Sequence, residues 1–187
     1  MKALTSLAMA APLEERSRAG DLSAFEALMR RHERLVLVTA LRMTGNLADA
    51  QDVSQEVFLR LYRNLGKLEH EQAIVSWLYR VTVNVCHDMH RKQPAHAPVE
   101  DAEGVREPGA GPQEGLAEAE RRRALQMSLR VLSEKERSAL VLRDLEGLST
   151  EEVARVLGSS EATVRSQISK ARIKMRDFME RHFRRRR

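Results

Sequence analysis

Hydrogen-bonding and cationic side chains gather between Ser149 and Ala171 at a spacing that is typical of DNA recognition. Gly158 supplies the left-handed backbone that a tight turn between two helices needs, and Ala154 allows these helices to cross closely. The outward positions of the second helix and its cap are Ser160, Glu161, Thr163, Arg165, Ser166, Ser169, Lys170 and Arg172. Such side chains read base edges and bind phosphates, so we predict a DNA-binding helix-turn-helix. The alternative is an ordinary helical hairpin with a solvated basic face.

A second set of side chains that could carry chemistry consists of Cys86, His87 and His90. Cysteine and histidine bind zinc, but only Cys86 and His90 lie one helical turn apart, and nothing nearby completes a four-ligand site. We therefore interpret Cys86 as a buried thiol and expect no metal or other cofactor. The sequence also lacks a phosphate-cradling glycine loop, a nucleophile elbow and an HExxH motif, so we predict that the chain is not an enzyme.

The composition favours a helical protein that binds polyanions. The 187 residues carry a formal net charge of +5, and aromatic residues make up only 4% of the chain, so the core must consist of Leu, Val, Ala and Met. One cysteine excludes an intramolecular disulfide and fits a reducing compartment. No run is long and apolar enough to span a membrane. We expect a cytoplasmic protein without stable membrane insertion, and interpret residues 1–20 as a flexible extension rather than a signal peptide.

Apolar residues recur at helical spacing from Asp21 to Lys92. They predict one helix that ends at Gly45, a second over residues 48–65 and a third over residues 73–91, with a polar loop at residues 66–72 between the last two. This half of the chain is therefore predicted to be a helical bundle.

The composition changes abruptly between Pro94 and Gly115, where proline, glycine and acidic residues dominate. Such a segment cannot bury enough apolar surface to offset the entropy of ordering it, so we predict a flexible acidic linker. Helical patterns return after Leu116, and capping-box patterns at Ser133 and Ser149 open two further helices before the last one, over residues 161–178. The arginine-rich end, residues 181–187, is interpreted either as a solvated tail or as a polyanion contact.

The predicted fold class is all-α, with two small helical domains joined by a flexible acidic linker. The predicted divisions are a 1–20 extension, a 21–93 helical domain, a 94–120 linker and a 121–187 helix-turn-helix domain.

These motifs resemble the extracytoplasmic-function (ECF) group of bacterial RNA polymerase sigma factors in the sigma-70 family. Ser133–Lys174 is similar to the family's C-terminal domain, which binds the minus-35 promoter element. Asp49–Asn64 resembles its core-polymerase-binding helix, and Ser76–Lys92 resembles the helix that engages and opens the minus-10 element. The resemblance covers most of the chain outside the first twenty residues and the linker. A helix-turn-helix alone is weakly specific, whereas three motifs in the family's order are strongly specific.

The resemblance implies a role for particular side chains. Those implied to dock on the clamp helices of the polymerase's largest subunit are Asp49, Asp52, Gln55, Glu56 and Arg60. Those implied to contact minus-10 DNA are Lys67, His70, Arg80, Asn84, His87, Arg91 and Lys92. In the family, the loop before the minus-10 helix, here residues 66–72, captures a flipped base, but this sequence lacks the aromatic side chains that the family often places near Leu68, Ile74 and Val75. Trp77 lies on the apolar stripe, so we predict that it packs in the core.

The resemblance also implies the partners and the function. The chain is expected to bind core RNA polymerase and to direct promoter recognition and transcription initiation, with a flap contact through the C-terminal domain. The acidic linker is expected to follow the RNA exit path, and an anti-sigma factor is a further candidate partner. Two alternatives remain: a dimeric helix-turn-helix regulator that acts without core polymerase, and an interaction module held by an inhibitory protein.

Overall fold

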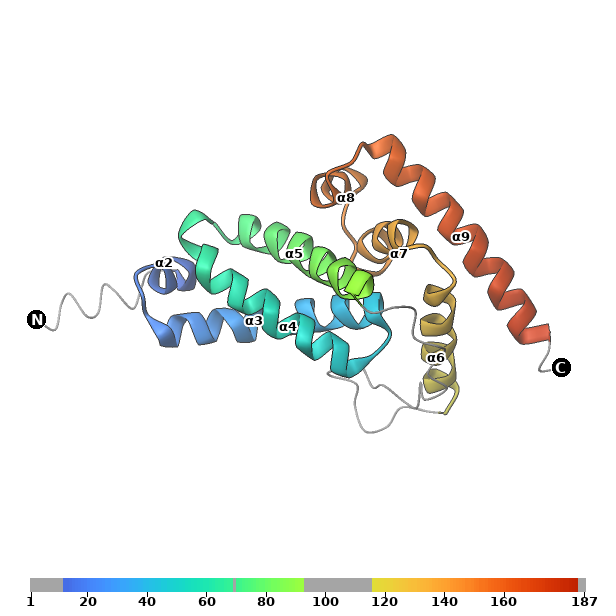
Figure 1. Ribbon diagram of the computed structural model, residues 1–187, viewed down its shortest axis with the longest axis horizontal. Coiled ribbons are helices and arrows are strands. Elements are labelled where there is room, and N and C mark those ends of the chain that lie inside the picture. The colour runs from blue at the N-terminus through green and yellow to red at the C-terminus, as the bar shows by residue number, and fades with distance from the viewer. Residues whose placement is uncertain (1–11, 69, 93–115, 185–187) are drawn as a thin grey trace, which may run out of the picture.

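The computed structural model describes residues 12–68, 70–92 and 116–184, and all regular elements in these ranges are helices (Figure 1). The N-terminal half contains α2 (Leu13–Arg18), α3 (Leu22–Thr44), α4 (Leu47–Asn64), the short 3-10 helix η1 (Leu65–Lys67) and α5 (Glu71–Lys92). The C-terminal half contains α6 (Leu116–Arg130), α7 (Glu134–Leu140), the π-helical turn η2 (Val141–Leu145), α8 (Thr150–Leu157) and α9 (Glu161–Arg184). The all-α prediction is confirmed.

The N-terminal helices form a bundle in which α3 packs against α2, α4 and α5. The side chains of Leu28, Val53 and Leu78, one from each of the three long helices, are fully buried at its centre. The Asp21 and Asn46 side chains accept backbone N–H groups at the starts of α3 and α4. These caps, together with the apolar stripes, explain why α3 and α4 could be predicted from the sequence.

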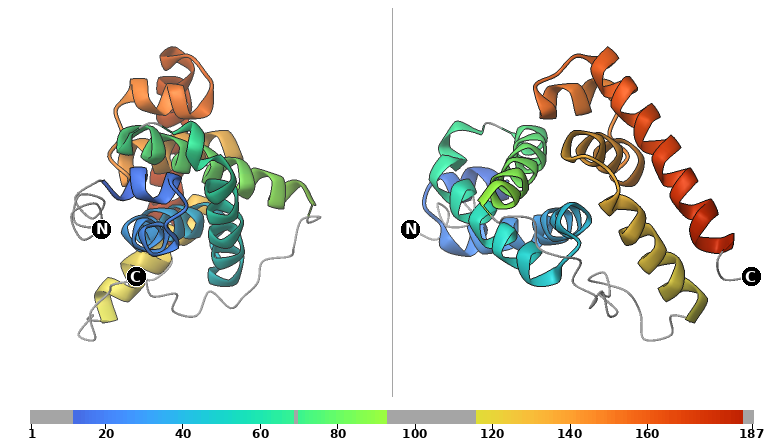
Figure 2. Two further views of the ribbon diagram at one scale, coloured as in Figure 1. Left: turned by 90° about the vertical axis from the view of Figure 1, so that its left-hand side faces the viewer. Right: turned by 45° about the vertical axis from the view of Figure 1, so that its right-hand side comes forward.

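The C-terminal helices form the predicted helix-turn-helix, with α8 packed on the first part of α9. Gly158 adopts the left-handed φ of 60° in the turn between them. Ala154, Val164 and Ile168 are buried where the two helices cross. Helix α9 then continues along α7 and α6, as the right view in Figure 2 shows.

Three elements differ from the sequence expectations. Helix α2 lies within the predicted flexible extension, where burial of Glu14 and Ser17 against the bundle stabilises it. Helix α6 begins at Leu116, where the helical pattern was expected to return, so only the 120 bound of the predicted linker differs, and the helix packs on α9. Helix α9 extends to Arg184 because no glycine or proline interrupts it. The acidic stretch at residues 94–115 and the tail at 185–187 lie outside the described residues.

The two halves pack against each other, although we expected domains tethered only by a linker. The Arg42 guanidinium of α3 donates to the Glu146 carboxylate at 2.8 Å and to the Leu145 carbonyl at 3.1 Å. The Arg137 guanidinium of α7 donates to the Met43 carbonyl at 2.7 Å. Helix α8 lies against α5. The described part of the chain therefore has one continuous apolar core that includes residues of both halves.

Candidate functional site

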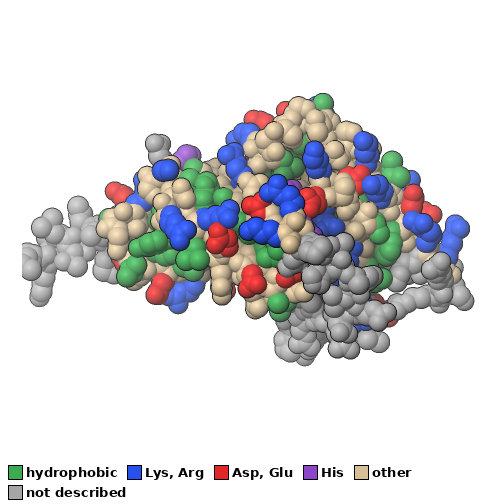
Figure 3. All heavy atoms as spheres, in the orientation of Figure 1, with side chains coloured by type: hydrophobic (Ala, Val, Ile, Leu, Met, Phe, Trp, Pro, Cys, Tyr) green, Lys and Arg blue, Asp and Glu red, His purple; other side chains and the backbone are tan. Residues whose placement is uncertain are grey.

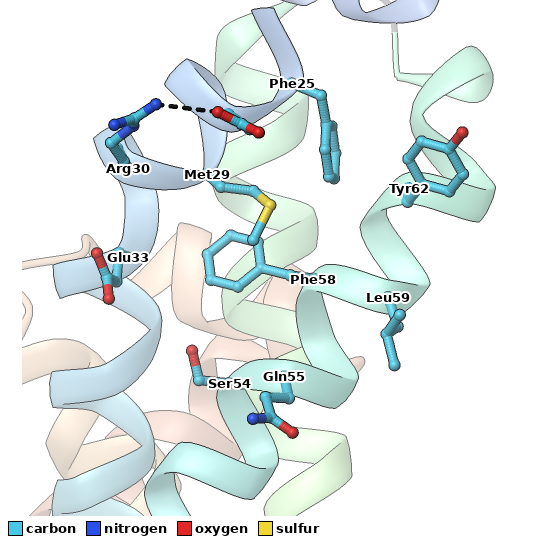
Figure 4. Close-up of a pocket in the computed structure, with 10 residues that line it drawn as sticks. Phe25, Met29, Arg30, Glu33, Ser54, Gln55, Phe58, Leu59 and Tyr62 are labelled. Atoms are coloured by element: carbon cyan, nitrogen blue, oxygen red, sulfur yellow. Dashed lines mark hydrogen bonds and ion pairs between the residues drawn. The ribbon is translucent and has the colours of Figure 1, made fainter. Parts of the chain in front are cut away.

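An open groove of ≈ 700 Å³ runs between α3 and α4 (Figure 4). Phe25, Met29 and Phe58 point toward one another in it, and the ring of Tyr62 meets that of Phe25 edge to face at 5.1 Å. Leu59 and Tyr62 are 54% and 58% exposed. On the face in Figure 3, apolar side chains over the N-terminal bundle lie among basic and acidic ones. An apolar floor with a charged rim is the anatomy of a protein-binding surface.

The side chains that the resemblance assigns to core polymerase lie along the same helix as this groove. Gln55 lines the groove itself, Asp52 is exposed, and Asp49 is partly exposed nearer the start of α4. Arg60 donates to the Glu56 carboxylate at 2.7 Å, one helical turn apart. The structure thus places the predicted residues beside and within one surface.

Sequence reasoning missed the apolar part of this surface. Phe58 and Tyr62 lie on the apolar stripe of α4, but Phe58 is buried whereas the Tyr62 side chain is exposed. Phe25 and Met29 come from α3 and are only partly buried. The one sequence feature that could have predicted this apolar surface is Leu59, because this large apolar residue lies beside the stripe rather than on it.

The candidate minus-10 residues of α5 lie on one helix face. Arg80, Asn84, His87 and Arg91 recur at spacings of four and three, and all except His87 are exposed. Lys92 is exposed at the end of α5, whereas Lys67 and His70 are exposed before the helix begins. The structure therefore brings the four predicted residues Arg80, Asn84, His87 and Arg91 to one face of α5, whereas Lys67 and His70 precede this helix.

Two of these α5 residues contact the C-terminal half. Arg80 donates to the Arg155 carbonyl at 3.2 Å, and the His87 Nε2 lies 2.9 Å from the Ser138 Oγ. Burial lowers the pKa of His87 below its usual range, so the imidazole is held neutral. In this arrangement His87 lies against Ser138 of the C-terminal half, and its expected contact with minus-10 DNA stays a prediction. Trp77 packs against the core as predicted, although it is only partly buried.

The candidate minus-35 residues lie along the exposed side of the first half of α9. Thr163, Ser166 and Lys170 are exposed there. The Ser160 hydroxyl accepts from the Thr163 backbone N–H at 3.1 Å, so Ser160 caps the helix. Arg165 donates to the Glu161 carboxylate at 2.8 Å. The helix therefore starts with hydrogen-bonding groups and an arginine, as base readout from the N-terminal end of a recognition helix requires.

A basic hollow of ≈ 500 Å³ adjoins this face. It is lined by Arg143, Thr150, Arg165, Ile168, Ser169, Arg172, Ile173 and Arg176. Arg172 donates to both carboxylate oxygens of Asp144, at 2.9 and 2.7 Å, and this pairing raises its pKa above the usual range. Sequence reasoning missed Arg143, Thr150 and Arg176. Arg176 could have been predicted from the sequence, because it follows Arg172 by four residues on the same helix. Arg143 and Thr150 could not, because they come from η2 and α8.

The Cys86 thiol is buried, as predicted, and burial raises its pKa to about 12. Within residues 12–68, 70–92 and 116–184, no three His, Cys, Asp or Glu side chains form a group that could hold a metal ion. Over the same ranges, no helix has the length and apolar character needed to cross a membrane.

Comparison with known proteins identifies both halves of the chain. Residues 28–95 match the family model for Sigma-70 region 2, and residues 122–175 match that for Sigma-70 region 4. These ranges correspond to most of the N-terminal bundle and to the helix-turn-helix half.

Relatives extend the similarity over nearly the whole chain. The ECF RNA polymerase sigma factor SigM of Mycobacterium tuberculosis is 36% identical over 159 residues, which cover 84% of this chain and 78% of SigM. The ECF RNA polymerase sigma-E factor of Escherichia coli is 34% identical over 170 residues, 86% of this chain and 88% of that protein.

Solved structures have the same fold. CnrH, in complex with the cytosolic domain of CnrY, superposes with a TM-score of 0.66 at 27% identity, over 90% of this chain and 95% of CnrH. The sigma factor RpoE of Bartonella quintana, in complex with the anti-sigma factor NepR, superposes with a TM-score of 0.62 at 18% identity, over 83% of this chain and 96% of that one. With its region 2 bundle, its region 4 helix-turn-helix and relatives that match over most of their length, the chain belongs to the ECF RNA polymerase sigma factors of the sigma-70 family, which direct transcription initiation.

Proposed function

We propose that this sigma factor binds core polymerase and promoter DNA through three separate surfaces of the described chain. The α3–α4 groove and the adjacent charged side of α4 dock on a helical element of the core enzyme. Lys67, His70 and the exposed face of α5 contact the downstream, minus-10 element. The first half of α9 and the basic hollow beside it contact the upstream, minus-35 element. The observation that carries the proposal is the groove.

The groove has the shape and chemistry that a helix of the core enzyme would fit. The groove has α3 on one side, α4 on the other and apolar side chains between them, which suits a helix laid lengthwise in it. The exposed Tyr62 and Leu59 side chains would be buried by such a partner, and buried aromatic side chains dominate the binding energy of many interfaces. Charged groups that line the groove, Glu26, Arg30 and Glu33, would orient the partner together with Asp52 and Glu56 on the adjacent side of α4.

Replacement of Leu59 and Tyr62 together by alanine tests this surface. Loss of a central aromatic anchor costs about 2 kcal/mol or more, so the affinity for core polymerase should fall by roughly 30-fold or more. The matched control is Leu22→Ala, because Leu22 is 65% exposed at the start of α3 and does not line the groove. Helical circular dichroism should be unchanged in both variants. If Leu59→Ala/Tyr62→Ala binds core polymerase as tightly as the Leu22 variant does, the groove is not the docking surface.

The two DNA surfaces are supported by the arrangement of their charges. On α5, Arg80, Asn84 and Arg91 face one side of the bundle. At α9, Arg143 and Arg176 add cations from outside the predicted recognition residues. Arginines around a shallow hollow fit the phosphates that flank a base-reading helix.

We also propose that the chain contributes no catalytic step of its own, because RNA synthesis belongs to the core enzyme it recruits. On this account it works in the cytoplasm, where polymerase and promoters are. An anti-sigma factor is a further partner that we propose, supported by the solved structures of CnrH and RpoE, each of which is in complex with a protein partner.

A further inference from the structure

Helix α2 has a fixed position on the bundle. The left-handed Gly20, with a φ of 88°, turns the chain from α2 into α3. Arg16, near the end of α2, donates to the Asp21 carboxylate at 3.1 and 2.7 Å, and the other oxygen of the same carboxylate caps α3. The orientation of α2 is therefore set by α3 itself.

Burial of the Glu14 carboxylate holds the inner face of α2. Its side chain is only 8% exposed, and the Arg31 guanidinium of α3 donates to it at 3.0 Å. A carboxylate that is buried without a cation loses its hydration free energy, and no ion pair offsets this loss. The ion pair between Glu14 and Arg31 therefore allows α2 to stay packed on the bundle.

The same guanidinium nitrogen of Arg31 also reaches α5. It donates to the Glu71 carboxylate at 3.2 Å, in the first turn of that helix. Glu71 follows His70 directly in the sequence. One side chain of α3 therefore connects α2 with the start of α5.

Helix α2 also contacts the chain before His70. It packs against η1, which contains Lys67, and the buried Leu65 and Leu68 anchor this segment to the core. The exposed Lys67 and His70 thus lie between two points that depend on Arg31: the α2–η1 contact on one side and Glu71 on the other.

We propose that Arg31 is a positioning residue for recognition of the minus-10 element, because it holds α2 and the start of α5 and thereby fixes where Lys67 and His70 present their side chains. The inference rests on the proposed role of these two residues in DNA contact. Arg31 acts through its two carboxylate partners and is not itself a DNA contact. Its replacement should therefore change which base is preferred, and not merely how much protein is folded.

The experiment measures initiation by holoenzyme reconstituted with core polymerase on a mapped promoter and its single-base variants. Arg31→Gln should reduce the ratio between the preferred and the substituted bases in the minus-10 element by about threefold or more, as disrupted indirect coupling does. The corresponding ratios in the minus-35 element should be unchanged. The matched control is Arg34→Gln, which removes the same charge from an exposed position of α3, and it should leave both sets of ratios unchanged.

A second substitution separates positioning from general damage. Adding Glu14→Gln to Arg31→Gln removes the buried charge that Arg31→Gln leaves unpaired, so α2 should pack again and the minus-10 preference should recover in part. Glu15→Gln, on the exposed side of α2, is the control and should give no recovery. If Arg31→Gln yields too little folded protein, Arg31→Lys replaces it, with a smaller loss of preference expected.

Two results would overturn the inference. One is an equal reduction of initiation on all promoter variants, which would make Arg31 a general structural residue. The other is unchanged preference in Arg31→Gln while Lys67→Ala and His70→Ala alter it. If the Lys67 and His70 variants also leave the preference unchanged, the proposed DNA role of this segment fails as well, so the two failures are distinguishable.

Discussion

Arg165 and Arg172 are two turns apart on α9 but have different acidic neighbours. Arg165 pairs with Glu161 near the start of the helix, whereas Arg172 pairs with Asp144 from η2. We expect Arg165→Ala to change the preferred base at one minus-35 position, at a cost of about 1–3 kcal/mol for the correct base. Arg172→Ala should weaken all sites alike and reduce the salt slope of binding by about 1. Affinities for single-base promoter variants at several salt concentrations give both quantities.

The opposite pattern, uniform weakening in Arg165→Ala and an altered base preference in Arg172→Ala, would mean that α9 approaches DNA in another orientation. Both side chains were identified from sequence spacing alone. Arg143 and Thr150 of the same hollow were not, because spacing along one helix carries no information about neighbours contributed by another element.

The buried imidazole of His32 should make the folded chain less stable in acid. Burial lowers the pKa of this imidazole below its usual range. The charge of Arg31 also lowers the pKa, whereas the carboxylates of Glu71 and Glu14 partly oppose the shift. The folded chain then binds fewer protons than the unfolded chain as the pH falls below about 6.5, so the free energy of unfolding decreases there. We expect His32→Gln to show a shallower decrease than the wild type between pH 7 and 5 in urea titrations. The exposed His70→Gln should retain the wild-type slope, and an equal slope in all three proteins would contradict this assignment.

At the scale of elements, the capping boxes are the features that the sequence predicted most directly. The Ser149 hydroxyl accepts from the Glu152 backbone N–H at 3.1 Å, and the Glu152 carboxylate accepts from the Ser149 backbone N–H at 2.7 Å. Ser149→Ala should lower the free energy of unfolding by about 1 kcal/mol, since the first turn of α8 loses its cap. Ser166→Ala, at an exposed position within α9, should change it by less than about 0.5 kcal/mol. Equal effects of the two substitutions on the free energy of unfolding would show that the Ser149 cap does not stabilise α8.

Helix α2 and the π-helical turn η2 could not be predicted from the sequence. A helix as short as α2 has little stability of its own, and its position depends on the burial of Glu14 against distant residues. In η2 the Glu146 N–H donates to the Val141 carbonyl, five residues back, and no residue type announces such a turn. The turn matters because Asp144 and Glu146, within and just after it, pair with Arg172 and Arg42.

At the scale of the whole molecule, the packing of the two halves conflicts with simultaneous binding to two promoter elements. Elements centred near minus 35 and minus 10 are roughly 25 base pairs apart, or about 85 Å of duplex. Here Arg42 and Glu146, 16% and 10% exposed, join the halves, and the Tyr79 hydroxyl donates to the same Glu146 carboxylate at 3.4 Å. We therefore predict that the halves separate when the chain joins core polymerase at a promoter.

Energy transfer between dyes on Gln51→Cys of α4 and Glu180→Cys of α9 measures this separation, because both positions are exposed and the buried Cys86 thiol is unreactive. Core polymerase should lower the transfer efficiency. Glu146→Gln should lower it even without core polymerase, since the buried ion pair between Arg42 and Glu146 that joins the halves is lost. Glu151→Gln removes an exposed pair with Arg155 and should have no effect. A transfer efficiency that core polymerase leaves unchanged would contradict the separation.

The most direct test of the central claim is transcription by purified core polymerase from a linear template that carries a mapped promoter of this chain. The account predicts that the wild-type chain yields a transcript with one defined start. That transcript should depend on both promoter elements, and Leu59→Ala/Tyr62→Ala should strongly reduce it. The contradicting result is no defined transcript at any concentration of the chain, with tight binding of the same duplex by a dimer of the chain in the absence of core polymerase.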